Sequence, residues 1–382
     1  VNVLLENRFG KKTHLASSLS TMIYGVFLII LELYALALII RAIFPEVTML
    51  QAAIISLTVS VLSVSFSGIM GASLTNVIHS GTIVVALTLS LILLWNRVGG
   101  INQAISLIIP NLDKISGPNI TPAIWSSATG LGLGVVGQLL LGKMSRLGGI
   151  SMVSNIAASC KSETHAILAF IIAGISSGLP TVMAGLVGIC SAALIGPAIA
   201  SLPSYSYIGL AMMQINPFVA GLLLAASAAA IVAAFGPGAI IMSNVFVDEI
   251  IVRLFHVNDQ QKRIMYTAVI VVVSLLSGIY VAFGQMKDIL PFLYLTAFPC
   301  TAPITVVILF GMFNQNIKEG YAFWSIVLGV STALVWGLVF DNPFDIPNIY
   351  ISFFLPIMIM GLGVWKNSFM RLFNKTVVNS NL

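Results

Sequence analysis

Charged residues are scarce in this sequence. Only 8% of the 382 residues are Asp, Glu, Lys or Arg, whereas 58% are hydrophobic, and the mean hydropathy is +1.05. A water-soluble domain carries about 25% charged residues to cover its surface. The composition therefore excludes a soluble protein and predicts a polytopic protein whose environment is the lipid bilayer. The basic residues form no stripe, so nucleic acid is not an expected partner.

Paired cysteines and catalytic motifs are also missing. Cys160, Cys190 and Cys300 stand alone in apolar surroundings without CxxC spacing, so neither a disulfide framework nor a metal centre is expected. No HExxH, GxSxG, P-loop or EF-hand pattern occurs. The sequence predicts neither an enzyme nor a cofactor, apart from Na⁺ or H⁺ as a coupling ion. No cleavable signal peptide is expected, because the first apolar run is too long and follows a basic segment.

Long apolar runs are abundant instead. Runs of about 20 apolar residues predict ten transmembrane helices, over residues 17–43, 49–66, 73–95, 123–142, 165–194, 216–244, 264–285, 289–312, 320–339 and 347–365. With both termini in the cytoplasm, thirteen Lys and Arg residues fall on the cytoplasmic side and four outside. We expect one all-α domain, residues 1–382, in the plasma (cytoplasmic) membrane.

Two connecting segments and several prolines suggest further structure. We expect a short surface helix in the external segment 99–120, and a lid or short helix in the uncharged stretch 197–214. Proline removes a backbone donor and tends to kink a helix. Kinks are therefore expected at the prolines inside the predicted spans, which are Pro180, Pro237, Pro291, Pro299 and Pro303.

The segment 123–142 holds glycines at positions 130, 132, 134 and 137. Each glycine inside a helix costs about 1 kcal/mol relative to alanine, so the middle of this span is its weakest part. In transporters, helices that open in the membrane are where substrates and ions bind. The alternative is close helix packing through small residues, and the segment alone does not decide between the two.

Few ionisable residues lie inside the predicted spans. Glu32 is the one carboxylate well inside a span, which makes it a functional candidate, although a protonated carboxyl group bonded to a neighbouring helix for structure alone is the alternative. His79 lies near the cytoplasmic end of its span and is a candidate for proton coupling or an ordinary interfacial residue. His14, His165 and His256 are predicted to be solvated. Asp248 and Glu249 are predicted to form local salt bridges beside Arg253.

Several segments together resemble one family, the sodium:solute symporters. The segments that carry the resemblance, in the order of the family, are NVLLENRFGKKTHLASSLSTMIY, FSGIMGASLTNVIHSGTIVV, GLGLGVVGQ with AASCKSETHA, AGLLLAASAAAIVAAFGPGAIIMSNVFVDEI, and PITVVILFGMFNQNIKEGYAFWSIVLG. They cover nearly the whole chain.

The resemblance implies the LeuT-type fold, a five-helix inverted repeat. The family usually has thirteen spans, three of which precede the loop that NRFG resembles, so the resemblance implies an incomplete first repeat. Residues 1–95 would be the remainder of that repeat, 96–122 an external loop, 123–312 the second repeat and 313–382 the C-terminal helices. The first helices would then come from a partner subunit or from an upstream part of the protein.

The resemblance also identifies positions for the coupling ion, and the sequence departs from the family at several of them. Ala233 and Ala234 stand where the family carries two hydroxyl residues that help to hold sodium, and alanine offers a hard cation no side-chain oxygen. Asn76 matches the position of an aspartate and His79 that of a glutamine, whereas Gln138 matches the glutamine of the family. These departures argue against ordinary sodium coupling. Glu32 and His79 are then the candidates for proton coupling, with uncoupled flux as the alternative.

The predicted function is passage of a small organic solute by alternating access. Gly130, Gly132, Gly134 and Gln138 would offer unwound backbone and an amide to the solute, and Trp125 would wall one side of the site or anchor the helix at the interface. Two other interpretations remain open. One is a non-transporting scaffold or sensor subunit, which the two alanines favour, and the other is an N-terminally truncated symporter fragment. The sequence does not indicate the substrate or the oligomeric state.

Overall fold

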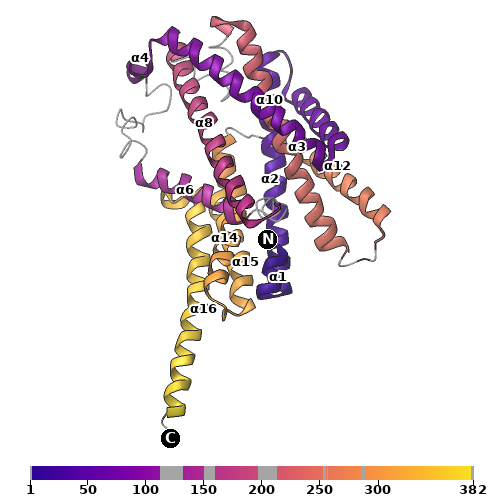
Figure 1. Ribbon diagram of the computed structural model, residues 1–382, viewed down its shortest axis with the longest axis vertical. Coiled ribbons are helices and arrows are strands. Elements are labelled where there is room, and N and C mark those ends of the chain that lie inside the picture. The colour runs from indigo at the N-terminus through magenta and orange to yellow at the C-terminus, as the bar shows by residue number, and fades with distance from the viewer. Residues whose placement is uncertain are drawn as a thin grey trace.

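In the computed structural model, the regular secondary structure of the described residues is entirely helical (Figure 1). It describes residues 2–111, 132–149, 160–196, 213–252, 255, 257–284 and 289–379, without the side chains of 65–76, 111, 132–135, 146–149, 237, 241, 290 and 367–379. The helices are α1 (Asn2–Phe9), α2 (Lys11–Ile43), α3 (Met49–Val98), α4 (Ile101–Ile108), the 3₁₀ turn η1 (Ile109–Asn111), α6 (Gly132–Gly149), α8 (Glu163–Ile195), α10 (Pro217–Phe246), the π-helical turn η4 (Val247–Ile251), α12 (Asp259–Phe283), α13 (Ile289–Phe292), the π-helical turn η5 (Leu293–Ala297), α14 (Phe298–Phe313), α15 (Glu319–Leu338), the 3₁₀ turn η6 (Pro343–Asp345) and α16 (Asn348–Asn379).

Eight helical segments of the described residues are long and apolar enough to cross a membrane. They are Lys11–Ile43, Val77–Val98, Glu163–Ile195, Pro217–Ile251, Asp259–Phe283, Leu293–Phe313, Glu319–Leu338 and Asn348–Lys366. The chain is therefore an all-helical polytopic membrane protein, as predicted. Two of the ten predicted spans are described only in part: 49–66 over the apolar helical segment Met49–Val64, and 123–142 from Gly132 onward.

The predicted spans 49–66 and 73–95 form one helix. The backbone of α3 is helical over 50 residues, about 75 Å at a rise of about 1.5 Å per residue, whereas the hydrocarbon core of a bilayer is about 30 Å thick. The residues between the two predicted spans include Gly68 and Gly71. Glycine weakens a helix but keeps every backbone donor, and residues 65–76 contain no proline, so the helix continues.

Local sequence signals explain where several helices begin. Thr48 and Gln51 form a reciprocal capping box at the start of α3, and Asn258 and Gln261 form another at the start of α12. Asn216 accepts hydrogen bonds from two backbone N–H groups of the first turn of α10. Each cap satisfies donors that have no partner within the helix.

The predicted short helix after the third apolar run is confirmed as α4. Its apolar side includes the buried Ala104 and Ile108, whereas Asn102 and Gln103 are exposed. Most of the predicted lid, residues 197–212, lies outside the described residues.

The predicted irregularity around Pro299 takes the form of a π-helical turn. Proline has no backbone N–H, so the carbonyl four residues before it loses its helical partner. The carbonyl of Leu295 instead accepts a 2.8 Å hydrogen bond from Nδ2 of Asn348 in α16. The same amide nitrogen lies 3.1 Å from the carbonyl oxygen of Ala333 in α15. Asn348 is only 2% exposed, so one buried amide repairs the backbone where three helices meet.

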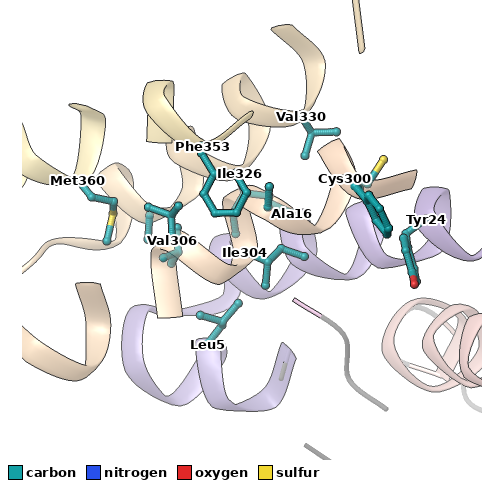
Figure 2. Close-up of a cluster of buried hydrophobic side chains, with 14 of the residues drawn as sticks. Leu5, Ala16, Tyr24, Cys300, Ile304, Val306, Ile326, Val330, Phe353 and Met360 are labelled. Atoms are coloured by element: carbon teal, nitrogen blue, oxygen red, sulfur yellow. The ribbon is translucent and has the colours of Figure 1, made fainter. Parts of the chain in front are cut away.

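A buried apolar cluster joins both ends of the chain around α14 (Figure 2). Leu5 of α1, Ala16 and Tyr24 of α2, and residues of α15 and α16 surround Cys300 and Ile304, which are completely buried. A second cluster packs α2 against α3, α10 and α12. Helix α2 takes part in both clusters, so it connects the two halves of the molecule.

One glycine allows the closest approach of α2 to α10. A β-carbon placed on Gly25 would lie 2.7 Å from Cβ of Met242, much closer than real side chains come. Met242 is itself only 1% exposed, and its Cβ cannot move without the backbone of α10. Gly25 therefore sets the distance between these two helices.

We predict that Gly25→Ala lowers the stability of the purified protein in detergent by about 1–3 kcal/mol, because overpacking forces α2 away from α10. The measurement is the thermal unfolding midpoint. Gly174→Ala in α8 is the matched control, since a β-carbon there meets no atom within 4 Å. An unfolding midpoint of Gly25→Ala at or above that of the control would contradict the close packing.

Candidate functional site

The glycine-rich segment is described from Gly132 as the regular helix α6, which continues to Gly149, beyond the predicted end of the span. Gly137 faces the hydroxyl of Tyr350, to which an added β-carbon would approach within 2.5 Å. Gly142 packs directly on the rings of Tyr294 and Phe298. In this conformation Gly137 and Gly142 serve close helix packing, which was one of the two roles expected for the glycine-rich segment.

Hydroxyl groups also tie the backbone of α6 to its neighbours. Thr305 in α14 donates a buried 3.1 Å hydrogen bond to the carbonyl of Ser145. The hydroxyl of Tyr294 in η5 lies 3.5 Å from the carbonyl of Leu139. The described part of α6 is thus held by contacts to its backbone. The side chain of Gln138, next to Leu139, is half-buried.

The structure places only some of the predicted substrate residues. Gly132 and Gly134 lie at the beginning of α6 and Gln138 in its middle, whereas Gly130 and Trp125 lie outside the described residues. Sequence reasoning missed Tyr294 and Tyr350, which come from distant segments and meet α6. Tyrosine is common in membrane proteins, so nothing in the sequence distinguished these two.

The contacts between α2 and α10 define a register. Ser18 hydrogen-bonds to Glu249, and Gly25 packs on Met242. From the first contact to the second, the position on α2 rises by seven and the position on α10 falls by seven, so the two helices are antiparallel. Seven residues are nearly two helical turns, so the contacts fall on the same side of each helix. One further step places Glu32 at the level of Phe235.

This register brings Glu32 to the level of Ala233 and Ala234. Glu32 is half-buried between the buried Leu31 and Leu33. Ala233 is half-buried and Ala234 exposed, while Phe235 beside them is 1% exposed. Glu32 and the two alanines therefore lie at similar heights along the helix pair, although the alanines are about 100° and 200° around α10 from Phe235, the side that packs on α2.

The remaining ion-coupling candidates lie on α3. His79 is half-buried, and its neighbours Val77 and Ile78 are 71% and 63% exposed. The side chain of Asn76 lies outside the described residues.

A polar cluster that was not predicted lies at the far end of the α2–α10 interface. One oxygen of Glu249, in the π-helical turn η4, accepts a 2.8 Å hydrogen bond from Nδ2 of Asn2 and another from the hydroxyl of Ser18. Nε2 of His14 lies 3.3 Å from the same oxygen. The prediction that His14 is solvated is wrong: its side chain is 2% exposed, because α1 and η4 cover the first turn of α2.

The local salt bridges predicted for Asp248 and Glu249 beside Arg253 stay a prediction, and the described contacts give the two carboxylates other partners. Asp248 accepts a 2.6 Å hydrogen bond from the hydroxyl of Tyr266 in α12, and Glu249 is bound by the N-terminal helices. Arg253 and His256 lie outside the described residues. Of the other predicted solvated histidines, His165 is exposed and lies 2.7 Å from the hydroxyl of Ser162.

The NRFG segment clamps α1 and α2 onto the loop between α14 and α15. Arg8 donates to the carbonyl of Gly311 at 3.2 Å and to that of Asn314, at the end of α14. Gly10 has a φ of +121° and lies against the carboxylate of Glu319, which accepts a 2.7 Å hydrogen bond from the backbone N–H of Lys12. The arginine therefore satisfies helix-end carbonyls, and the glycine supplies the sharp turn between two helices.

Comparison with known proteins identifies relatives of this chain. A model of the Sodium:solute symporter family matches residues 1–329. The sodium/proline symporters of Escherichia coli (strain K12) and Salmonella typhimurium (strain LT2) are each 25% identical to this chain. The match to the first covers 72% of this chain and 55% of the relative, and the match to the second covers 70% and 53%. The chain thus spans about half the length of the curated relatives it matches.

The fold also matches a solved structure. A Na⁺-coupled sialic acid symporter, in a substrate-bound outward-open state, superposes with a TM-score of 0.70 over 94% of this chain and 76% of that one. The two sequences are 18% identical, so this comparison shows a shared fold.

We predict that Arg8→Lys destabilises the protein by about 1 kcal/mol, since one ammonium group cannot reproduce the arrangement of guanidinium donors on two carbonyls. The measurement is the thermal unfolding midpoint, together with the rate of proteolytic cleavage between α14 and α15. Arg41→Lys is the matched control, because Arg41 is exposed at the end of α2. Equal effects of the two substitutions would show that the contacts of Arg8 with the carbonyls of Gly311 and Asn314 contribute nothing to stability.

Proposed function

Because the chain belongs to the sodium:solute symporter family, whose model matches residues 1–329, we propose that it carries a small organic solute across the cytoplasmic membrane by alternating access. The family match is the observation that carries this proposal, since α2, α6, α10 and α14 all lie within the matched residues. The family consists of transporters, so the chain is not an enzyme. In the proposed arrangement, residues 1–95 and 123–312 correspond to the two repeats, and both termini are cytoplasmic.

The solute contacts are proposed to lie at the start of α6. Gly130, Gly132 and Gly134 would offer backbone groups when the helix opens, Gln138 an amide, and Trp125 a stacking surface. The packing of Gly137 on Tyr350 and of Gly142 on Tyr294 supports the proposal that α6 is fixed from Gly137 to its C-terminal end. A helix that is held at one end and rich in glycine at the other opens preferentially at the glycine-rich end.

Coupling is proposed to use a proton on Glu32 rather than sodium at Ala233 and Ala234. The α2–α10 register supports this, because the carboxylate of Glu32 lies at the level of the two alanines. A carboxyl group that exchanges a proton there can replace the positive charge that a cation brings in relatives with hydroxyl residues. His79 remains a second candidate, and uncoupled flux is the alternative outcome.

A second candidate function is that of a non-transporting scaffold or sensor subunit. The specific observation in its favour is that alanine stands at both hydroxyl positions. In either function, helices of a partner subunit are proposed to complete the site around α6 and α10. The intact mass of the purified protein and of its co-purifying polypeptides tests for such a partner.

We predict solute uptake into proteoliposomes that depends on a pH gradient and not on a sodium gradient. Proline and sialic acid are the first probes, because the matched relatives are named for these solutes. Glu32→Gln should lower pH-driven uptake at least about tenfold, since an amide cannot bind and release the proton. Glu163→Gln, at the exposed start of α8, is the control.

Uptake that requires sodium and survives both Glu32→Gln and His79→Ala would contradict proton coupling. No uptake of a broad solute panel, combined with a stable stoichiometric partner, would favour the scaffold.

We also predict that Gln138→Leu lowers uptake about tenfold or more, mainly through weaker solute binding, because it removes both an acceptor and a donor. The control is Gln103→Leu, on the exposed side of α4. Solute binding is measured by the ligand-induced shift of the unfolding midpoint. An unchanged shift would remove Gln138 from the proposed site.

A further inference from the structure

A histidine lies between two carboxylates at the junction of α1, α2 and η4. Nε2 of His14 is 3.3 Å from Oε2 of Glu249 and 3.8 Å from Oε2 of Glu6. The histidine side chain is 2% exposed and the carboxylates are 19% and 21% exposed, respectively. The three groups come from three separate helical elements, so they meet only when α1 is docked.

The carboxylate of Glu249 is also held by hydrogen bonds from α1 and α2. Nδ2 of Asn2 and the hydroxyl of Ser18 both donate to the oxygen that His14 faces. Leu5, next to Glu6 in α1, is 2% exposed, and Val247, two positions before Glu249, is completely buried.

Other ionisable groups of the neighbouring elements have different described partners. In η4, Asp248 bonds to Tyr266 of α12. In α15, the carboxylate of Glu319 accepts from the backbone N–H of Lys12. The groups that face the imidazole in the described contacts are therefore Glu6 from α1 and Glu249 from η4.

We propose that His14, Glu6 and Glu249 form a proton-binding site, and that the proton bound there holds α1 against η4. A protonated imidazole is a cation that pairs with both carboxylates. When the proton leaves for the solvent, a neutral ring remains between two like charges, and the docked arrangement loses its attraction. Docking of α1 is therefore favoured below the pH at which His14 releases its proton and weakens above it.

The proposal is independent of transport, since it concerns the attachment of α1 to the rest of the protein. The test compares two neighbouring positions of α1. Leu5 is buried at 2% exposure and Leu4 is 65% exposed, so a cysteine at position 5 reacts with a maleimide only when α1 leaves its place, whereas one at position 4 reacts in both states. The rate ratio of Leu5→Cys to Leu4→Cys removes the intrinsic effect of pH on thiol reactivity.

The background protein carries Cys160→Ser and keeps Cys190 and Cys300, which are both 0% exposed. The full chain is purified, placed in nanodiscs and labelled between about pH 6 and pH 9. We expect the ratio to rise about tenfold or more with pH when His14 is present. In His14→Gln the ratio should not depend on pH, and in the matched control His165→Gln the rise should persist.

A ratio that does not change with pH while His14 is present would overturn the proposal, as would the same rise in His14→Gln. If His14→Gln does not fold, Glu249→Gln takes its place, with a reduced rise expected and an unchanged rise contradicting the site. A purely structural role for His14 predicts a raised ratio at every pH in the variant and no pH dependence in its parent, which is distinct from the expected result.

Discussion

The hydrogen-bonding requirement of the backbone governs this structure. In a bilayer an unsatisfied N–H or C=O group costs several kcal/mol, so helices must be continuous or repaired where they are interrupted. Asn348 repairs the carbonyl of Leu295 that Pro299 leaves without a helical partner. Arg8 does the same for the carbonyls at the end of α14. Both repairs come from segments distant in sequence, so the irregular places of the helices are also the places where the chain is tied together.

Helix α2 packs against both groups of helices. It contributes to the apolar cluster around α14 and to the one around α10. Its interface with α10 and η4 has three levels nearly two turns apart: Ser18 on Glu249 at one end, Gly25 on Met242 in the middle, and Glu32 at the height of Phe235. A shift of α2 along α10 would change all three levels at once, since helices packed this closely slide as rigid units.

Hydropathy and local signals predicted much of the fold, because they depend on nearby residues. The apolar spans, the helix α4 and the irregularity before Pro299 follow from composition and from the chemistry of glycine and proline. The continuity of α3 does not, since hydropathy averages cannot show whether two apolar runs share one helix axis. The environment of His14 was mispredicted for a related reason: its basic sequence neighbours suggested solvent, whereas Glu249, 235 positions later, buries it.

The same limit applies to the candidate site and shows what the structure adds. Glu32 and the alanines at 233 and 234 were each recognisable in the sequence, Glu32 as a charge within a span and the alanines as departures from a family pattern. Their shared level required the α2–α10 register, which rests on Ser18 and Gly25, two small residues with no functional signal of their own. Small residues set the distance and register between membrane helices. In this chain Ser18 and Gly25 therefore decide which residues of α2 and α10 stand at the same height.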